Sequence, residues 1–395
     1  MLINVCSNCD VKSIREAVLA IAVGGEVVVE PGTYFENKII IDRSMKLSGK
    51  PGAVIDGQNL AEHIIIVSHD DVTIQNLTLQ NTGTSYIQEV SAIRILSSKN
   101  CQILNNRFEN TTYAIYFEKS DLSIVKNNII KGSAKDESSG GNGIHIWTGS
   151  DYTIEGNDIT GHRDGIYFEF VKSAKVLNNT VHNNIRYGLH FMSSHYCEYR
   201  HNVFSNNESG VAVMYSRFIT MDSNRFEKSS GAASYGLLLK DIYTSEITNN
   251  IFEDNTVGVF MESTNRTNFL NNQYHHNGWA MRVMGDCDLN IFKHNNITEN
   301  TFDVATNSDH NLNTFSENYW SQYEGYDLNH DGIGDVPYRS VSLSSVILER
   351  LDSSFVLLKS FLFILLDSIE RGLPTLIPGR MEDTSPLMKK WSNHD

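Results

Sequence analysis

The sequence is poor in cysteine and in basic residues. Its five cysteines are an odd number scattered over 395 residues, which excludes a disulfide framework. It has 32 Lys and Arg against 47 Asp and Glu, a formal charge of -15. This balance argues against nucleic acid or an anionic membrane surface as the main partner, because both attract basic surfaces. Cations and basic protein faces are better candidates.

The first ten residues, MLINVCSNCD, lack the basic and apolar segments of a secretory leader. We therefore expect either a cytoplasmic protein or a mature form whose leader has been removed. Cys6 and Cys9 form the one C-x-x-C pair, with no second pair at zinc-finger spacing. This favours a chance pair or a local disulfide over a thiolate metal site.

An internal repeat runs through most of the chain. In each repeat an Asn is followed two residues later by a large apolar residue. The ten positions are Asn106, Asn128, Asn157, Asn179, Asn202, Asn224, Asn250, Asn272, Asn295 and Asn318. The steps are 22 or 23 residues, except two of 29 and 26, and these two contain insertions rich in small polar residues. Insertions on a fixed period are typical of loops between stacked repeats.

The repeat predicts an all-β fold. Short runs of Val, Ile, Phe and Tyr lie between Asn and Gly clusters, which is typical of short strands and tight corners. We predict a right-handed parallel β-helix with coils about 4.8 Å apart. An Asn suits the left-handed conformation of a corner, and its amide can bond to the equivalent Asn one coil away. The stretch KSIREAVLAIA has Ile14, Val18 and Ile21 at helical spacing and predicts a helix that caps the first coil.

The predicted organisation has three parts. Residues 1–25 are an amino-terminal segment with the capping helix, 26–337 the β-helix with an Asp-rich loop at its end, and 338–395 an apolar helical tail.

The repeats align a column of side chains on the outer face. In RYGLHFM, Leu189 and Phe191 point into the core, so His190 and Met192 should face solvent. On this register Met214 stacks on Met192, and Glu169 lies one coil before it. Two thioethers with an imidazole suit Cu(I), so His190, Met192, Met214 and Glu169 are predicted copper ligands. The alternative is a protein-docking face, because Met and aromatic residues are enriched at interfaces.

The repeat ends after Trp320, and an acidic loop follows. In YDLNHDGIGDVPY, oxygen donors occupy positions 1, 3, 5 and 9 of a calcium loop: Asp327, Asn329, Asp331 and Asp335. Tyr338 at position 12 excludes an EF-hand. The loop either binds calcium or forms a metal-free turn.

Residues 353–372, SSFVLLKSFLFILLDSIERG, are apolar nearly all round. Their charge-free run is too short to span a membrane. The segment either packs on the β-helix or docks on a membrane protein or bilayer surface, and we favour docking. The docking side chains would be Phe355, Leu358, Phe361, Leu362, Leu365 and Ile369. The following DTSPLMKKW is expected to trail off as an extended tail.

Several tracts in order resemble the NosD family. They are the opening CSNCDVKSIREA, RYGLHFM with GVAVMYS, GYDLNHDGIGDVPYR, and the tail ending SPLMKK. The resemblance implies a periplasmic, non-enzymatic subunit of an ABC transporter complex with a permease and an ATPase. It further implies a copper chaperone and apo nitrous-oxide reductase as partners, and a role in assembling the reductase's copper-sulfur site. The family's leader is missing here, so export is inferred.

Two other function classes stay open. Parallel β-helices host polysaccharide lyases and epimerases, and GHRDGIYFEF supplies His162, Arg163, Asp164, Tyr167 and Glu169, with His190 one coil on. Such a set could remove a sugar C5 proton. No Asp pair suited to glycoside hydrolysis stands on adjacent coils. A purely structural surface protein would have neither copper nor a permease partner.

Overall fold

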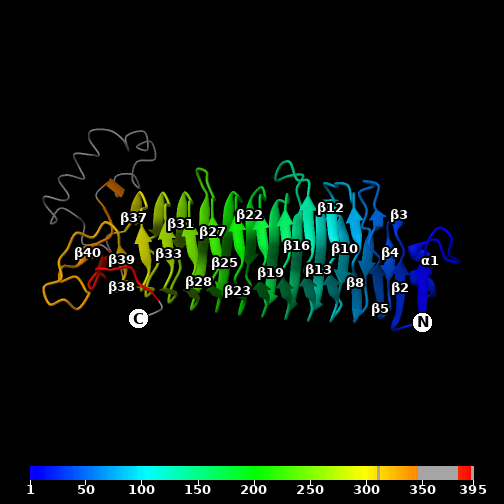
Figure 1. The fold of residues 1–395 in the computed structure, drawn as a ribbon, viewed down its shortest axis with the longest axis horizontal. Coiled ribbons are helices and arrows are strands. Elements are labelled where there is room, and N and C mark those ends of the chain that lie inside the picture. Colours follow the sequence, from blue (N-terminus) through cyan, green and yellow to red (C-terminus); the bar gives the residue numbers. More distant parts are fainter. Residues whose placement is uncertain (309–311, 343, 346–380, 393–395) are drawn as a thin grey trace. The chain divides into compact units, whose positions relative to one another are not determined.

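The computed structural model describes residues 1–308, 312–342, 344–345 and 381–392. It divides into two units, residues 1–208 and 209–395, and each is described by itself. Both units are β-helices in which every full coil contributes one strand to each of three parallel sheets (Figure 1). The predicted fold class is confirmed for these residues.

In the first unit, the sheet with the longest strands is called the long-strand sheet. It contains β4 (Ile39–Ile41), β7 (Ile65–Val67), β10 (Ser91–Leu96), β13 (Tyr113–Asp121), β16 (Asn142–Ser150), β19 (Asp164–Lys172) and β22 (Tyr187–Met192). The second sheet contains β1 (Leu2–Val5), β2 (Gly25–Val29), β5 (Met45–Gly49), β8 (Val72–Gln75), β11 (Gln102–Leu104), β14 (Ile124–Lys126), β17 (Thr153–Glu155), β20 (Lys175–Leu177) and β23 (Glu198–Arg200). The third contains β3 (Gly32–Phe35), β6 (Ala53–Asp56), β9 (Thr78–Gln80), β12 (Arg107–Thr111), β15 (Ile129–Gly132), β18 (Asp158–Thr160), β21 (Thr180–His182) and β24 (Val203–Ser205).

The second unit repeats this arrangement. Its long-strand sheet contains β25 (Ser209–Arg217), β28 (Tyr235–Tyr243), β31 (Val257–Glu262), β34 (Trp279–Val283) and β37 (Phe302–Ala305). Its second sheet contains β26 (Thr220–Asp222), β29 (Glu246–Thr248), β32 (Asn268–Leu270), β35 (Ile291–Lys293), β38 (Thr314–Ser316), β41 (Glu382–Asp383) and β40 (Tyr338–Arg339). Its third sheet contains β27 (Arg225–Glu227), β30 (Ile251–Glu253), β33 (Gln273–His275), β36 (Asn296–Thr298) and β39 (Tyr319–Trp320).

A short helix closes the amino-terminal end of the first unit (Figure 1). Helix α1 (Ile14–Ala20) begins after Ser13, whose side chain accepts a hydrogen bond from the Glu16 amide. The Glu36 carboxylate accepts from the amides of Ile14 and Arg15, which have no partner inside the helix. Ile14 and Val18 are buried against the first coils, so the predicted cap is confirmed.

The predicted asparagine ladder is confirmed. In the first unit, Asn157 donates from its backbone N and from Nδ2 to Oδ1 of Asn179, both at 2.9 Å. The residue before each ladder position takes the left-handed corner, as at Asn178, whose φ is 55°. From the sequence, one Asn is predicted to form both the corner and the ladder. In the structure the two roles fall on consecutive residues, because the side-chain amide can reach the next coil only from the inner side of the corner. A second, unpredicted ladder includes Asn184 and Asn207.

Stacked rings fill much of the core of the second unit. Phe226, Phe252 and Tyr274 stack face to face at centroid distances of 4.8 and 5.0 Å. Equivalent positions of these three coils carry an aromatic ring, so each aromatic pair adds to the apolar burial that holds the coils together.

Candidate functional site

Strand pairing in the long-strand sheet of the first unit sets the candidate site. β19 and β22 pair in register, with Tyr167 beside His190 and Glu169 beside Met192. Leu189 and Phe191 are fully buried. The predicted register of these two strands is therefore confirmed.

The prediction that His190 faces solvent is wrong. His190 is 7% exposed, and two residues of the same column, Tyr116 and His145, are 4% and 6% exposed. The column is covered because its rings pack on one another, with Tyr116 and His145 stacked at 4.2 Å and His145 and Tyr167 at 4.7 Å. The outer face here is a packed layer of rings. Burial lowers the pKa of His145 to about 3, so this imidazole is neutral.

The imidazole of His190 lies among rings and beside one carboxylate. The ring centroids of Tyr167 and Tyr187 are 5.1 and 4.9 Å away. Both ring nitrogens are buried, and neither has a hydrogen-bond partner among the described residues. Nδ1 lies 3.7 Å from Oδ2 of Asp164, which is too long for a hydrogen bond. A buried imidazole with two unused nitrogens is costly unless something else binds it.

Asp164 is fully buried and fixed by Arg186. Nε and Nη2 of Arg186 donate to its two carboxylate oxygens at 2.9 and 2.5 Å. Burial acts to raise the pKa of Asp164, but His190 and Arg186 outweigh it, so the pKa is lowered. The structure thus holds an ionised carboxylate beside the imidazole. From the sequence, Asp164 is predicted only as a catalytic acid or base. Its ion pair with Arg186 cannot be predicted from the repeat pattern.

Glu169 and Met192 extend the site outward. Both side chains are partly buried. The hydroxyl of Tyr167 lies between them, 3.4 Å from Oε2 of Glu169 and 3.9 Å from Sδ of Met192. We call His190, Met192 and Glu169 the His–Met patch. Met214 is partly buried on β25 in the second unit, and its predicted stacking on Met192 stays a prediction.

The donor set of the patch suits a soft cation. It offers an imidazole nitrogen, a thioether sulfur and a carboxylate oxygen, and thioethers select Cu(I) over hard ions such as Mg²⁺ or Ca²⁺. Because the nitrogens of His190 have no partner among the described residues, this donor is free to bind such an ion.

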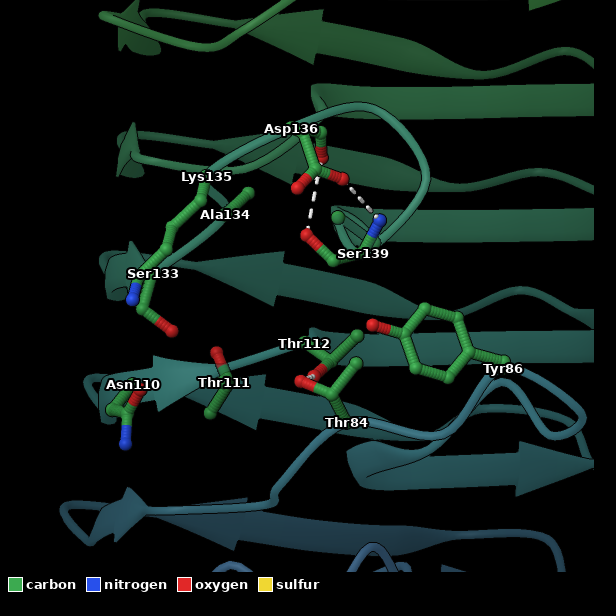
Figure 2. A pocket seen from close by; sticks show the side chains of 12 residues that line it. Thr84, Tyr86, Asn110, Thr111, Thr112, Ser133, Ala134, Lys135, Asp136 and Ser139 are labelled. Atoms are coloured by element: carbon green, nitrogen blue, oxygen red, sulfur yellow. Dashed lines mark hydrogen bonds between the residues drawn. The ribbon is translucent and has the colours of Figure 1, made fainter.

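A polar cavity of about 430 Å³ lies elsewhere in the first unit (Figure 2). Hydroxyl groups of Thr84, Thr112 and Ser139 line it, together with Lys135 and Asp136. Asp136 accepts hydrogen bonds from the Ser138 hydroxyl and the Ser139 amide. None of the predicted copper ligands lines this cavity, and Asp136 is its one carboxylate. It therefore lacks the paired carboxylates of glycoside hydrolysis.

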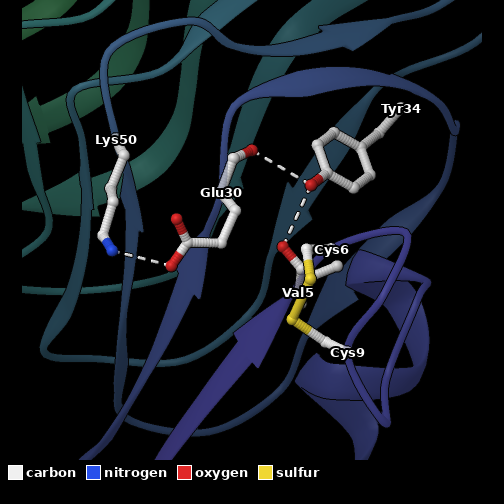
Figure 3. Close-up of a disulfide and its surroundings, with 6 residues drawn as sticks. All are labelled: Val5, Cys6, Cys9, Glu30, Tyr34 and Lys50. Atoms are coloured by element: carbon white, nitrogen blue, oxygen red, sulfur yellow. Dashed lines mark hydrogen bonds and ion pairs between the residues drawn. A yellow bond between two sulfur atoms is a disulfide. The ribbon is translucent and has the colours of Figure 1, made fainter.

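Cys6 and Cys9 form a disulfide at the end of β1 (Figure 3). Beside it, the Tyr34 hydroxyl donates toward the carbonyls of Val5 and Glu30 at 2.9 and 3.0 Å, and Lys50 pairs with Glu30. The sequence leaves open a chance pair, a local disulfide or a thiolate metal site for these two cysteines, and the structure shows the local disulfide.

The other three cysteines, Cys101, Cys197 and Cys287, are buried and not in disulfides. Burial raises the pKa of Cys101 to about 11 and that of Cys287 to about 12. Their thiols stay protonated at neutral pH, so they make poor metal ligands.

The Asp-rich loop holds itself together through its own backbone. Asp327 accepts from the amides of Asp331 and Gly332, Asp331 from that of Ile333, and Asp335 from that of Leu328. Asn329 also accepts from the Asp331 amide. These bonds occupy oxygens that calcium would use, as in a metal-free turn. The calcium site stays a prediction.

The predicted docking residues Phe355 to Ile369 lie outside the described residues. The stretch DTSPLMKKW, however, does not trail off. Asp383 takes the next ladder position after Asn318, accepting from its backbone N and Nδ2 at 3.1 and 2.9 Å. Trp391 stacks on His294 at 3.6 Å. The prediction of an extended tail is wrong because these residues satisfy donors that the final coil would otherwise leave unpaired.

Comparison with known proteins indicates the family. A family model described as "Periplasmic copper-binding protein (NosD)" matches residues 135–325, and one described as "Right handed beta helix region" matches residues 4–159. A protein of Stutzerimonas stutzeri named "Probable ABC transporter binding protein NosD" is 27% identical over 91% of this chain and 86% of its own length. Its namesake in Pseudomonas aeruginosa is 26% identical over 91% and 87%. These matches support a NosD-family protein.

Solved structures share the fold of this NosD-family chain. The catalytic domain of an alpha-1,3-glucanase superposes with a TM-score of 0.68 at 14% identity, covering 81% of this chain and 69% of that one. A surface adhesin of Streptococcus pneumoniae, PfbA, gives 0.57 at 14% identity, covering 83% and 93%. At this identity the likeness shows the β-helix alone. Across the described part of the chain, no helix is long and apolar enough to cross a membrane.

Proposed function

We propose that this NosD-family protein works in the periplasm as a non-enzymatic accessory protein of an ABC transporter. It binds copper transiently at the His–Met patch and passes it toward the copper-sulfur site of nitrous-oxide reductase. Copper is the cargo of this reaction, so the patch must release the ion as well as hold it.

The imidazole of His190 carries this proposal. Its two buried nitrogens have no hydrogen-bond partner among the described residues, while Met192 and Glu169 place a thioether and a carboxylate on the same patch. Asp164, held by Arg186, faces Nδ1. In this arrangement Nε2 would bind the ion, and Asp164 would favour the tautomer that leaves Nε2 free.

The periplasmic location rests on two observations. The matching family is described as periplasmic and copper-binding. The Cys6–Cys9 disulfide fits an oxidising compartment, because cytosolic reductants keep most thiols reduced.

The names of the relatives, both called binding proteins of ABC transporters, support an ABC transporter as partner. We expect a permease and an ATPase, with a copper chaperone as donor and apo nitrous-oxide reductase as acceptor. Residues 353–372 are the candidate docking segment, since they form the most apolar run of the sequence.

The burial of three of the acid and base candidates supports a non-enzymatic role. His162 and Asp164 are fully buried and His190 is nearly so, whereas Tyr167 and Glu169 are partly exposed. A polysaccharide could not place its C5 proton within hydrogen-bond reach of the three buried groups, as general base catalysis requires.

The decisive experiment is anaerobic Cu(I) titration of the full chain against a chromogenic Cu(I) chelator. Met192→Leu preserves shape and removes the sulfur. Its matched control is Met284→Leu, because Met284 is also partly buried and lies outside the patch. We expect Met192→Leu to weaken Cu(I) binding at least about 10-fold, with the control unchanged. Equal affinity in all three proteins would contradict the proposal.

A further inference from the structure

The third sheet of the second unit carries a second cluster of ligand-type side chains. Glu253 ends β30 and pairs in register with His275, which ends β33, and His276 follows directly. One carboxylate oxygen of Glu253 and one ring nitrogen of each histidine lie within 4.8 Å of one another. Among the residues that the structure describes, this is the one group of three His, Cys, Asp or Glu that converges in this way.

The backbone explains why two consecutive histidines point the same way. Neighbouring residues of a strand normally face opposite sides of the sheet. His276 instead has a φ of 54° at the corner after β33, which turns its side chain back beside His275. The two rings stack with centroids 3.7 Å apart. A corner that serves the fold thus brings two imidazoles together.

Neighbouring coils orient both imidazoles. Nδ1 of His275 lies 2.9 Å from Oγ1 of Thr298, and Nε2 of His276 lies 2.6 Å from Oε2 of Glu299. Nδ1 of His276 is 3.9 Å from Oδ1 of Asp254. Such bonds fix the rings as partners do behind metal-bound histidines.

We propose that His275, His276 and Glu253 bind a divalent transition metal of the Zn²⁺ type. Two imidazoles and a carboxylate are the ligands of many zinc sites, and they suit Zn²⁺ and Cu²⁺ better than Mg²⁺ or Ca²⁺. The cluster has no sulfur, so it differs from the His–Met patch in the ion it selects. Metal–ligand bonds of about 2.1 Å require the three atoms to approach more closely. The side chains of Glu253 and His276 are 25% and 48% exposed, which leaves them free to move together.

One cation competes for this cluster. Arg225 pairs with Glu253 and also with Glu227. A bound metal would take the Glu253 carboxylate and leave Arg225 with Glu227. The pKa of the neighbouring Glu299 is lowered mainly by its hydrogen bond with His276. The positive charge of Lys390 lowers it further. Removing the positive charge of Arg225 should therefore strengthen metal binding.

The test is Zn²⁺ titration of the full chain by calorimetry, repeated with Co²⁺ to record the visible spectrum of the bound ion. His275→Asn and His276→Gln should each weaken Zn²⁺ binding at least about 10-fold, and Arg225→Gln should strengthen it several-fold. The matched control is His182→Gln. His182 lies in the third sheet of the first unit and pairs with Asp158 at 3.0 Å, a His–carboxylate pair without a second histidine.

Two results would overturn the proposal. One is unchanged Zn²⁺ affinity in both His275→Asn and His276→Gln. The other is an equal loss in His182→Gln, which would mean dispersed surface binding. Cu(I) titration of the same variants separates this site from the His–Met patch, since their Cu(I) affinity should equal that of the unmodified chain.

Discussion

Nδ1 of His190 lies 3.7 Å from Oδ2 of Asp164, and that carboxylate is already held by Arg186. The imidazole therefore has a charged neighbour but no hydrogen bond in the described structure. This relationship makes His190 the candidate ligand of the proposed copper site. His162, a fully buried histidine, uses one of its two nitrogens: Nδ1 contacts the Thr112 carbonyl at 3.2 Å, whereas Nε2 has no partner among the described residues.

Replacing His190 by leucine tests this assignment. His190→Leu keeps most of the volume and removes two buried nitrogens that have no hydrogen-bond partner among the described residues, so the free energy of unfolding should change by about 1 kcal/mol or less. Asp164 keeps its pairing with Arg186. Cu(I) affinity should fall at least about 10-fold. Urea unfolding and Cu(I) titration on the same samples measure both effects. A large loss of stability with unchanged Cu(I) binding would make His190 structural.

The asparagine ladder should dominate the stability of the coils. Asn179 donates to Asn202 and to the Ile154 carbonyl and accepts from Asn157, all in the buried interior. Asn179→Ala leaves several of these groups unpaired, at about 1–3 kcal/mol each, so we expect a loss of at least about 3 kcal/mol.

Asn178 is the matched control for this change. It is exposed and left-handed, with φ at 55°. Glycine accepts that conformation freely, so Asn178→Gly should change stability by less than about 1 kcal/mol. Urea unfolding compares the two variants, and similar losses at both positions would mean that the ladder adds little.

The coil architecture could be predicted because the sequence pattern repeats at a nearly fixed spacing. Each coil repeats the same inward pattern, so residues such as Leu189 and Phe191 could be assigned to the core from spacing alone. The burial of His190 could not be predicted in this way. It depends on rings from its own and neighbouring coils, such as Tyr187 and Tyr167, packing over the outer face.

Contacts that do not repeat from coil to coil also could not be predicted from the sequence. The ion pair of Asp164 with Arg186 joins residues at positions that vary from coil to coil. Asp383 meets Asn318 across 65 residues, after the repeat has ended. A pattern that predicts stacking contains no information about a segment that returns once. The metal cluster at His275 was missed for a related reason, since only the corner at His276 turns both rings to one side.

Stability of the second unit should fall as the pH rises, because of Asp303. Burial raises the pKa of Asp303 from 3.8 to about 7, and the Tyr338 hydroxyl donates to Oδ2 at 2.6 Å. Between these two values the folded protein holds a proton that the unfolded chain has lost. The stabilisation is therefore complete below about pH 4 and is lost as the pH rises through about 7.

Asp303→Asn removes this pH dependence. Its amide oxygen still accepts from Tyr338, and no buried charge forms. Relative to the unmodified chain, the variant should gain about 1–3 kcal/mol between pH 5 and pH 8. Urea unfolding at both pH values measures the gain. The control is Asp151→Asn, because Asp151 is exposed. A constant difference between variant and parent at both pH values would contradict the assignment.

Asp383 should stabilise the carboxy-terminal end of the second unit. Its Oδ2 accepts from the backbone N and Nδ2 of Asn318 and, at 2.9 Å, from Nε1 of Trp320. Three donors converge on one oxygen, which explains why an acceptor-only carboxylate stands where earlier coils have asparagine. Asp383→Ala removes the acceptor of the Asn318 backbone N and of Trp320 Nε1, whereas Nδ2 of Asn318 still donates to the Phe292 carbonyl, and we expect a loss of about 2 kcal/mol or more.

Hydrogen exchange locates that loss. In Asp383→Ala the amides of β38 and β39 should exchange faster, while those of the first unit keep their protection, because exchange reports opening of local cooperative segments. Asp383→Asn is the sharper variant. It still accepts through Oδ1, but its amide group replaces the oxygen that accepts from the Ser385 backbone N, so its loss should be smaller than that of alanine. Equal protection of β38 in all three proteins would show that the returning segment does not close the β-helix.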